Sequence, residues 1–198
     1  MQHAFDFLTA KDAILKSVID KYGHPTIQFR DQGFAAMVHI ILEQQVSIAS
    51  ARAAYRKLAA HLGELTPGNV LDTPDEAMRG CGISRQKILY IKDMASKVVS
   101  GKLDFESLAA KAEAEIRAEL LTIKGVGNWT VDVYLMFCLQ SPDVIPVGDI
   151  AIRNAIKTLY GLETVDEMTA LAEDWKPFRT FASYILWHDY LSRRGRTI

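Results

Sequence analysis

The stretch Leu121–Thr130 reads LTIKGVGNWT and decides the fold. A predicted helix ends near Leu121, a turn with Gly125 and Gly127 follows, and a second helix begins at once. Two glycines allow positive φ and a close approach of the backbone to another surface. The second helix presents unpaired N–H groups and the positive end of its dipole, which together bind anions. The stretch therefore predicts two helices joined by a tight turn whose main chain binds a phosphate group.

This glycine turn has two other interpretations, a nucleotide-binding loop and a purely structural connection. A nucleotide-binding loop is excluded, because no predicted strand precedes the turn and the pattern GxGxxG is incomplete. A purely structural connection between two helices stays open at this point.

Apolar residues recur at helical spacing along nearly the whole chain, and no alternating run is long enough for a sheet. We therefore predict an all-α fold. The expected helices include Leu8–Tyr22 with Thr9 as N-cap, Phe34–Glu43, a helix from the N-cap Ser47 to about His61, a short helix opened by a capping box at 73–76, and Asp149–Tyr160.

The composition sets the class of protein but does not indicate a ligand. The 198 residues are 49% hydrophobic and 24% charged, as in globular proteins, with a formal net charge of −1. Any binding of nucleic acid must therefore come from local arrangement rather than from overall charge. Cys81 and Cys138 suit neither a disulfide framework nor a cysteine-rich metal site. Without a signal peptide or a transmembrane run, we expect an intracellular protein with no membrane partner.

Several stretches together resemble one known family. Ile123–Thr130 resembles the hairpin of the helix-hairpin-helix DNA glycosylases, whose hallmark is that hairpin, a Gly/Pro-rich loop and an invariant aspartate. Asp149, at the end of the segment IPVGD, stands where the family places its aspartate. Further stretches resemble the 3-methyladenine DNA glycosylase II branch: Ile41–Ser47 (ILEQQVS), Gly82–Lys87 (GISRQK), and Trp175–Arg179 (WKPFR) leading to Trp187.

The resemblance implies a two-lobed helical bundle with the active-site cleft between the lobes. One lobe is predicted at 28–138 and contains the hairpin at 121–130; the other combines 1–27 with 139–198. The implied activity is that of a monofunctional glycosylase, which flips an alkylated purine out of the duplex and hydrolyses its N-glycosidic bond in base excision repair. The expected partner is double-stranded DNA containing a damaged base, bound by a monomer in the cytoplasm or nucleoid of a bacterium or the nucleus of a eukaryote.

Two departures from related families narrow the activity. Bifunctional members carry a Schiff-base lysine where this chain has Trp129, so we expect no lyase activity. Some of those members also hold an iron–sulfur cluster on four cysteines, which Cys81 and Cys138 cannot supply.

Asp149 is the predicted catalytic residue. Breaking an N-glycosidic bond builds positive charge on the sugar, and a carboxylate beneath the ring stabilises that charge. An ordinary helix N-cap is the alternative role, and the two roles are compatible.

Four aromatic side chains are predicted to line the base pocket. A base alkylated on a ring nitrogen is cationic, and the indole faces of Trp129 and Trp187 would bind it by stacking and cation–π attraction. Tyr184 and His188 flank Trp187 and are expected to complete the pocket. Core positions for the tryptophans stay open as the alternative.

The resemblance also assigns contacts to the DNA. Gln45, with Gln44 beside it, would fill the space that the flipped base leaves. The full set of predicted DNA contacts is Gln44, Gln45, Ser47, Lys87, Gly125, Gly127 and Thr130. The chemistry requires no cofactor, but the resemblance implies Na⁺ or K⁺ at the hairpin, bound by the main-chain carbonyls of Leu121, Ile123 and Val126 and bridging to a DNA phosphate.

Other functions fit part of this pattern. A non-catalytic helix-hairpin-helix DNA-binding module would use the turn but would not need Asp149. A glycosylase for oxidised or deaminated bases would use both and differ only in its base pocket.

Overall fold

The computed structural model describes residues 1–196, and in this range it contains helices and no strand, which confirms the predicted all-α fold. The last two residues of the predicted lobe 139–198 lie outside the described residues. The helices are α1 (Gln2–Lys11), α2 (Ala13–Tyr22), α3 (Phe34–Glu43), α4 (Ile48–Leu62), α5 (Pro67–Asp72), α6 (Asp75–Gly80), α7 (Arg85–Val99), α8 (Phe105–Leu108), α9 (Glu113–Leu120), α10 (Asn128–Phe137), α11 (Ile150–Tyr160), α12 (Val165–Glu173) and α13 (Arg179–Ser192).

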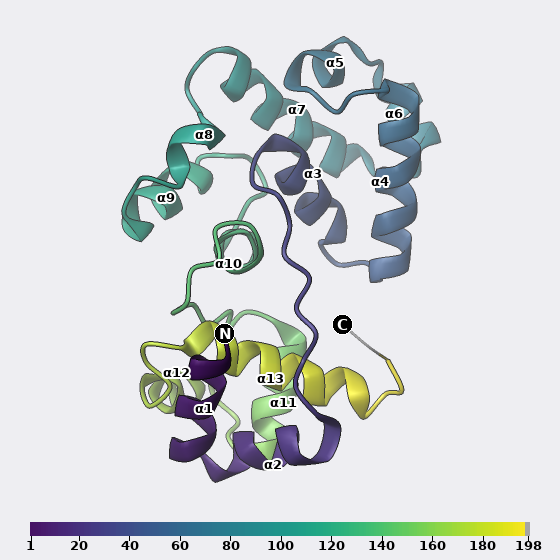
Figure 1. Cartoon of the computed structure of the whole chain (residues 1–198). Coiled ribbons are helices and arrows are strands. Elements are labelled where there is room, and N and C mark those ends of the chain that lie inside the picture. Colours follow the sequence, from purple (N-terminus) through teal and green to yellow (C-terminus); the bar gives the residue numbers. More distant parts are fainter. Residues whose placement is uncertain (197–198) are drawn as a thin grey trace. The chain divides into compact units, whose positions relative to one another are not determined.

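The chain divides into two compact units, which are described separately (Figure 1). The first unit combines Met1–Phe29 with Leu135–Ile198, and the second is Arg30–Tyr134. Helix α10 begins in the second unit and ends in the first. The lobe boundaries and the cleft predicted from the sequence stay predictions.

In the unit Arg30–Tyr134, the long helix α7 packs against α3, α5 and α6, and α3 packs against α4. Helix α3 carries a nearly continuous apolar sequence and is buried on most of its surface, as expected of a central helix. The same unit holds further side chains that are less than 2% exposed, including Leu58, Val70, Met78, Ile88 and Ile91. This core supports the segment after α3 and the glycine turn before α10.

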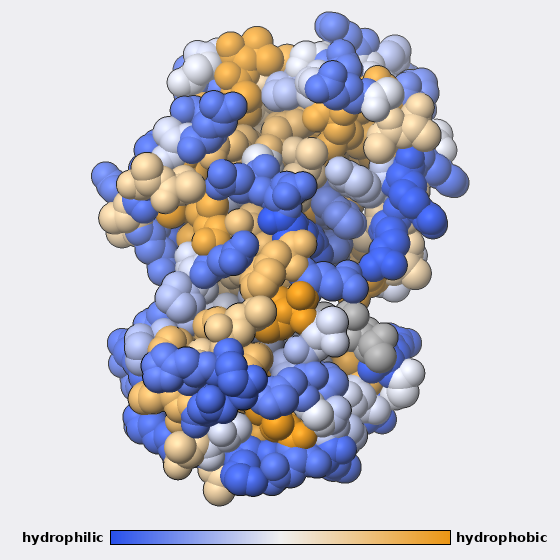
Figure 2. Space-filling view, viewed as in Figure 1, coloured by the Kyte–Doolittle hydropathy of each residue, from blue (hydrophilic) through white to orange (hydrophobic). Residues whose placement is uncertain are grey.

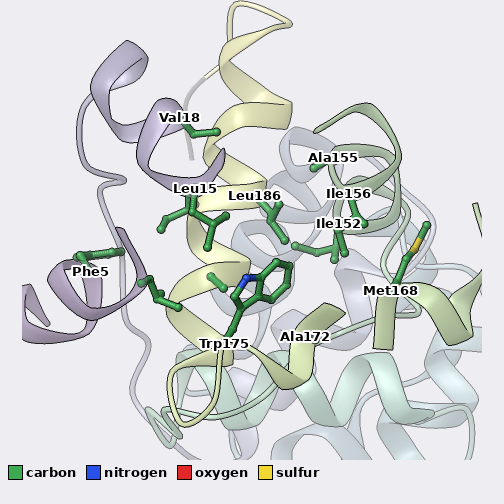
Figure 3. Close-up of a cluster of buried hydrophobic side chains, with 13 residues drawn as sticks. Phe5, Leu15, Val18, Ile152, Ala155, Ile156, Met168, Ala172, Trp175 and Leu186 are labelled. Carbon is green, nitrogen blue, oxygen red and sulfur yellow. The ribbon is translucent and has the colours of Figure 1, made fainter. Parts of the chain in front are cut away.

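In the other unit, α13 packs against α1, α2 and α11, and α12 packs against α11. Figure 3 shows the core of this unit, with Trp175 among aliphatic side chains from several helices. Trp175, Leu15, Ile152 and Leu186 are at most 1% exposed. The core fixes the start of α11, where Asp149 lies, and α13, which carries Tyr184, Trp187 and His188.

The predicted helix Leu8–Tyr22 is wrong, because the chain breaks at Asp12 into α1 and α2. Asp12 has extended backbone angles, and its carboxylate accepts hydrogen bonds from the N–H groups of Ile14 and Leu15 and so caps α2. The predicted N-cap Thr9 lies inside α1, where its hydroxyl donates to the Asp6 carbonyl. An aspartate at an N-cap is more favourable than the continuous helix that hydrophobic spacing alone suggests.

The predicted capping box at 73–76 is also wrong. Pro74 is the N-cap of α6 and makes no side-chain bond to its first turn. The Thr73 hydroxyl instead donates to the Asn69 carbonyl at 2.7 Å, because Thr73 closes the preceding helix α5.

The predicted helix Phe34–Glu43 and the N-caps Ser47 and Asp149 are confirmed. Hydrophilic residues cover much of the face in Figure 2, with hydrophobic residues exposed between them. Among residues 1–196, every helix is too short or too polar to cross a bilayer.

Candidate active site and DNA-binding hairpin

The glycine turn between α9 and α10 is shaped by Gly125. This residue has φ +71°, and a Cβ atom placed on it would overlap the ring of Tyr90. Both the left-handed backbone and the contact with Tyr90 therefore require glycine here. Of the two glycines in this turn, only Gly125 uses the positive φ that glycine allows, because the φ of Gly127 lies outside that range.

Gly127 lies directly before α10 and has a different environment. A Cβ atom at Gly127 would meet no described atom within 4 Å. The folded chain therefore leaves room for a side chain at Gly127. This bare backbone next to the N–H groups of a helix N-terminus is a surface that a phosphate can approach.

The hairpin carries the main-chain carbonyls of Leu121, Ile123 and Val126, the predicted ligands of a monovalent cation. The Ile123 carbonyl accepts a hydrogen bond from the Val126 N–H at 3.1 Å and keeps a second lone pair for another partner. The Ile123 and Val126 side chains are buried, which anchors the turn, whereas Leu121 is 42% exposed. Main-chain oxygens suit hard cations, and a Na⁺ or K⁺ site at Leu121, Ile123 and Val126 stays a prediction.

The segment after α3 contacts the hairpin through Gln44. The Gln44 side-chain amide donates to the Gly125 carbonyl at 3.0 Å and to the Thr130 hydroxyl at 2.9 Å. Thr130 is only 2% exposed, so its hydroxyl faces Gln44 rather than solvent. Gln45, the next residue, is exposed and adopts φ +55°.

Lys87, predicted to contact DNA, makes internal contacts. Its ammonium group donates to the carbonyls of Leu42 at 2.7 Å and Gln44 at 2.8 Å. Burial lowers the pKa of Lys87 from its usual value. Ser47, another predicted contact, is exposed, and its hydroxyl accepts the Ser50 N–H at 3.2 Å as the N-cap of α4.

Asp149 lies at the N-terminus of α11 in the other unit. The turn before it is closed by a bond from the Asp149 N–H to the Pro146 carbonyl at 2.8 Å. One carboxylate oxygen, Oδ1, accepts the N–H groups of Ala151 at 2.8 Å and Ile152 at 3.0 Å. The same oxygen accepts the indole N–H of Trp187 at 3.1 Å. These bonds fix the position of a half-buried carboxylate at the positive end of a helix.

Trp187 forms an aromatic group with Tyr184 and Phe137. Its ring centroid lies 5.6 Å from that of Phe137 and 6.3 Å from that of Tyr184. The Tyr184 side chain is 1% exposed, and its hydroxyl donates to the Met136 carbonyl at 3.0 Å, so its edge is committed to the core. Burial raises the pKa of Tyr184 well above its usual range.

The other two predicted base-pocket residues are His188 and Trp129. His188 is hydrogen-bonded through Nε2 to the Tyr22 carbonyl at 3.2 Å and packs edge-on against the Tyr22 ring. Trp129 is half-buried in the first turn of α10 and belongs to the unit Arg30–Tyr134. The structure therefore brings Asp149, Trp187 and Tyr184 together, and the role of Trp129 beside them stays a prediction.

Sequence reasoning missed an ion pair that supports α10. Asp132 is 6% exposed, and its carboxylate lies 2.7 Å from Arg117 Nη1 on α9. Burial raises the pKa of Asp132 to about 6, while the Arg117 guanidinium opposes that shift. The available signal was one acidic residue within the otherwise apolar run VDVYLMF.

A family comparison agrees with this geometry. Residues 38–179 match the model of the HhH-GPD superfamily base excision DNA repair proteins. The chain belongs to this superfamily. The matched range includes the segment after α3, the hairpin and Asp149, and it confirms the family resemblance seen in the sequence.

This HhH-GPD protein is similar to several named relatives. It is 33% identical over 165 residues to DNA-3-methyladenine glycosylase 1 of Schizosaccharomyces pombe, covering 80% of this chain and 72% of that protein. It is 26% identical over 198 residues to a putative DNA-3-methyladenine glycosylase of Bacillus subtilis, covering 94% and 68% respectively.

Solved structures show the same fold. A 3-methyladenine DNA glycosylase of S. pombe in complex with abasic DNA matches with a TM-score of 0.86 and 29% identity, covering 93% of this chain and 95% of that one. A DNA-3-methyladenine glycosidase of Bacillus halodurans matches with a TM-score of 0.82 and 30% identity, covering 98% and 92%.

Proposed function

We propose that this protein is a monofunctional DNA glycosylase, which acts as a monomer and hydrolyses the N-glycosidic bond of alkylated purines in duplex DNA. The observation that carries this proposal is the carboxylate of Asp149, held by the first N–H groups of α11 and by the indole of Trp187. The names of its relatives support the substrate class, because several are 3-methyladenine glycosylases.

The proposed chemistry uses Asp149 as an electrostatic stabiliser. When the bond between C1′ and the base nitrogen breaks, the base takes the electron pair and the sugar becomes positively charged. A cationic alkylated base leaves as a neutral molecule, so protonation of the leaving group is not required. The Asp149 carboxylate stabilises the sugar cation and orients a water molecule, whose hydroxyl adds to C1′ while its proton is released.

The aromatic group beside Asp149 supports selection of an electron-poor base. The N–H of Trp187 is bonded to Asp149, and a π-face of the same indole is the proposed recognition surface for a flipped base. A cationic purine stacks more strongly on an indole than a neutral purine does, typically by about 0.5–2 kcal/mol. Trp129, predicted from the sequence to bind the base, offers no amine for a Schiff base.

The hairpin is the proposed site of phosphate binding. The bare backbone at Gly127 and the start of α10 would contact a phosphate near the lesion, with Na⁺ or K⁺ at the carbonyls as a bridge. Because main-chain groups would bind the phosphate, a net charge of −1 is compatible with DNA binding.

The deciding experiment is an excision assay with a panel of duplexes. We expect release of 3-methyladenine and 7-methylguanine, and DNA strands that remain intact until the product is treated with alkali. Release of 8-oxoguanine or uracil in place of methylated purines would instead favour the alternative glycosylase. Strand cleavage without alkali would contradict the monofunctional assignment.

A non-catalytic DNA-binding module predicts another pattern. Such a module would bind a duplex containing an abasic analogue and release no base from any member of the panel. The same preparation therefore serves both measurements, and intact binding with no release would refute the proposed activity.

A further inference from the structure

The segment that follows α3 is fixed in place immediately before its exposed tip. The tip is Gln45, which is exposed and whose φ of +55° is unusual for a residue with a side chain. Such a conformation is less favourable than ordinary backbone for a residue with a side chain. Surrounding contacts must offset this cost, and they come from Lys87 and Gln44.

Lys87 reaches this segment from the first turn of α7. Its ammonium group donates to the Leu42 carbonyl in the last turn of α3 and to the Gln44 carbonyl just after it. A cation at a helix C-terminus is favoured by the helix dipole and satisfies carbonyls that lack intrahelical partners. The two bonds fix the direction of the main chain as it enters Gln45.

Gln44 fixes the same segment through its side chain. Its amide bonds to Gly125 and Thr130 join the segment to both sides of the glycine turn. The acceptor at Gly125 is a main-chain oxygen of the residue whose positive φ shapes the hairpin. The position of Gln45 is therefore tied to the position of the hairpin within the unit Arg30–Tyr134.

We infer that Lys87 and Gln44 are positioning residues that hold Gln45 in the conformation needed to enter the base stack, at a fixed distance from the phosphate-binding hairpin. The inference rests on the proposed function, because Gln45 has a space to fill only when a base is flipped. It replaces direct DNA contact, predicted for both residues from the sequence, with a role exerted through Gln45. Preorganisation of this kind lowers the entropy cost of ordering a loop on binding.

Lys87→Met separates positioning from direct phosphate contact. The variant keeps most of the aliphatic stem and loses both carbonyl bonds. We expect its affinity for a duplex with an abasic analogue to fall roughly 5- to 10-fold, as for loss of about 1 kcal/mol. Affinity for an intact duplex and the salt dependence of binding should match wild type.

A direct phosphate contact predicts a different result. In that case Lys87→Met would weaken binding to both duplexes by the same factor. It would also reduce the slope of the logarithm of the binding constant against the logarithm of the salt concentration by about one. That outcome would overturn the inference. Lys102→Met, at an exposed lysine of the same unit, is the matched control and should change neither affinity.

A double-mutant cycle with Gln45→Ala tests whether Lys87 acts through Gln45. If it does, Lys87→Met/Gln45→Ala binds the abasic analogue no more weakly than Gln45→Ala alone. Additive losses contradict the inference. Lys87→Arg, which retains donors for both carbonyls, should recover part of the affinity in the presence of Gln45 but none in its absence.

Gln44→Ala provides a second route should Lys87→Met fold poorly, as judged by its thermal unfolding midpoint. It removes the bridge to Gly125 and Thr130 and should show the same lack of additivity with Gln45→Ala. The binding assays need no base release, so they distinguish failure of this inference from failure of the proposed activity. A protein that releases no base can still show the coupling.

Discussion

The same local arrangement occurs twice in one unit, at Asp12 and at Asp149. Each aspartate is the N-cap of a helix, and one oxygen of each accepts the N–H groups two and three residues further on. Each also accepts an indole N–H, from Trp175 at 2.9 Å and from Trp187 at 3.1 Å.

The two arrangements differ in how the bonds are distributed and in what surrounds them. At Asp12 the bonds use both oxygens, because Oδ2 accepts Trp175 and the Tyr160 hydroxyl, and Trp175 is 1% exposed within the core. At Asp149 the backbone and indole bonds end on Oδ1, Trp187 is only half-buried, and the next residue, Ile150, is 72% exposed. A capping aspartate with an indole partner is therefore not itself a sign of catalysis. The two aspartates themselves are both half-buried, so the difference lies in the indole partner, which is buried at Asp12 and half-buried at Asp149.

We expect the largest difference between the two sites when each aspartate is replaced with asparagine. Asp149→Asn should lower the rate of base release at least about 100-fold, because a neutral amide does not stabilise a sugar cation. Its affinity for DNA should stay near wild type. Its free energy of unfolding should change little, because asparagine caps helices as well as aspartate and one amide oxygen can accept the three bonds.

Asp12→Asn should give the reverse result. Its amide NH₂ would face the N–H of Trp175 or the hydroxyl of Tyr160, which lowers the free energy of unfolding by about 1–3 kcal/mol. Base release per folded molecule should be unchanged. Single-turnover assays measure the rate of base release, and thermal unfolding measures the stability of each variant. Base release that survives in Asp149→Asn would contradict the proposed mechanism.

A smaller contrast is expected from replacing each tryptophan with phenylalanine. Trp187→Phe removes the donor that orients Asp149, so the single-turnover rate should fall roughly 10-fold, as for about 1.4 kcal/mol. Trp175→Phe should instead lower the unfolding midpoint and leave the rate of the folded protein unchanged. Equal effects of the two variants on the rate would mean that the indole bond to Asp149 has no part in the reaction.

The smallest effect is expected at Tyr160 and depends on pH. Burial, together with the nearby Asp12 carboxylate, raises the pKa of Tyr160 well above its usual range. The phenol ionises in the unfolded chain near pH ~10 but not in the folded chain, so stability from this group is lost as pH rises above that value. Tyr160→Phe should lower the free energy of unfolding by about 1 kcal/mol at neutral pH. Above pH ~10 the free energy of unfolding of this variant should fall less steeply with pH than that of wild type. Denaturant unfolding across that pH range measures both effects.

Local sequence signals were enough to predict the all-α fold, the helix Phe34–Glu43, the glycine turn between two helices and the N-cap at Asp149. These features depend on residues within a few positions of one another, such as Gly125 beside the start of α10. The break at Asp12 was not predicted, since its other partners, Tyr160 and Trp175, lie 148 and 163 residues away. The internal role of Lys87 was missed for the same reason, because a lysine in a sequence carries no sign of the carbonyls it will meet.

The sequence by itself determined an all-α HhH-GPD protein with a glycine hairpin and an aspartate at a helix start, because backbone propensities and capping act over a single turn. Only the tertiary structure decided which indole each aspartate meets, the buried Trp175 or the half-buried Trp187, and that Lys87 and Gln44 hold the segment before Gln45. Burial and side-chain bonds between distant segments arise when helices pack, and no local pattern encodes them.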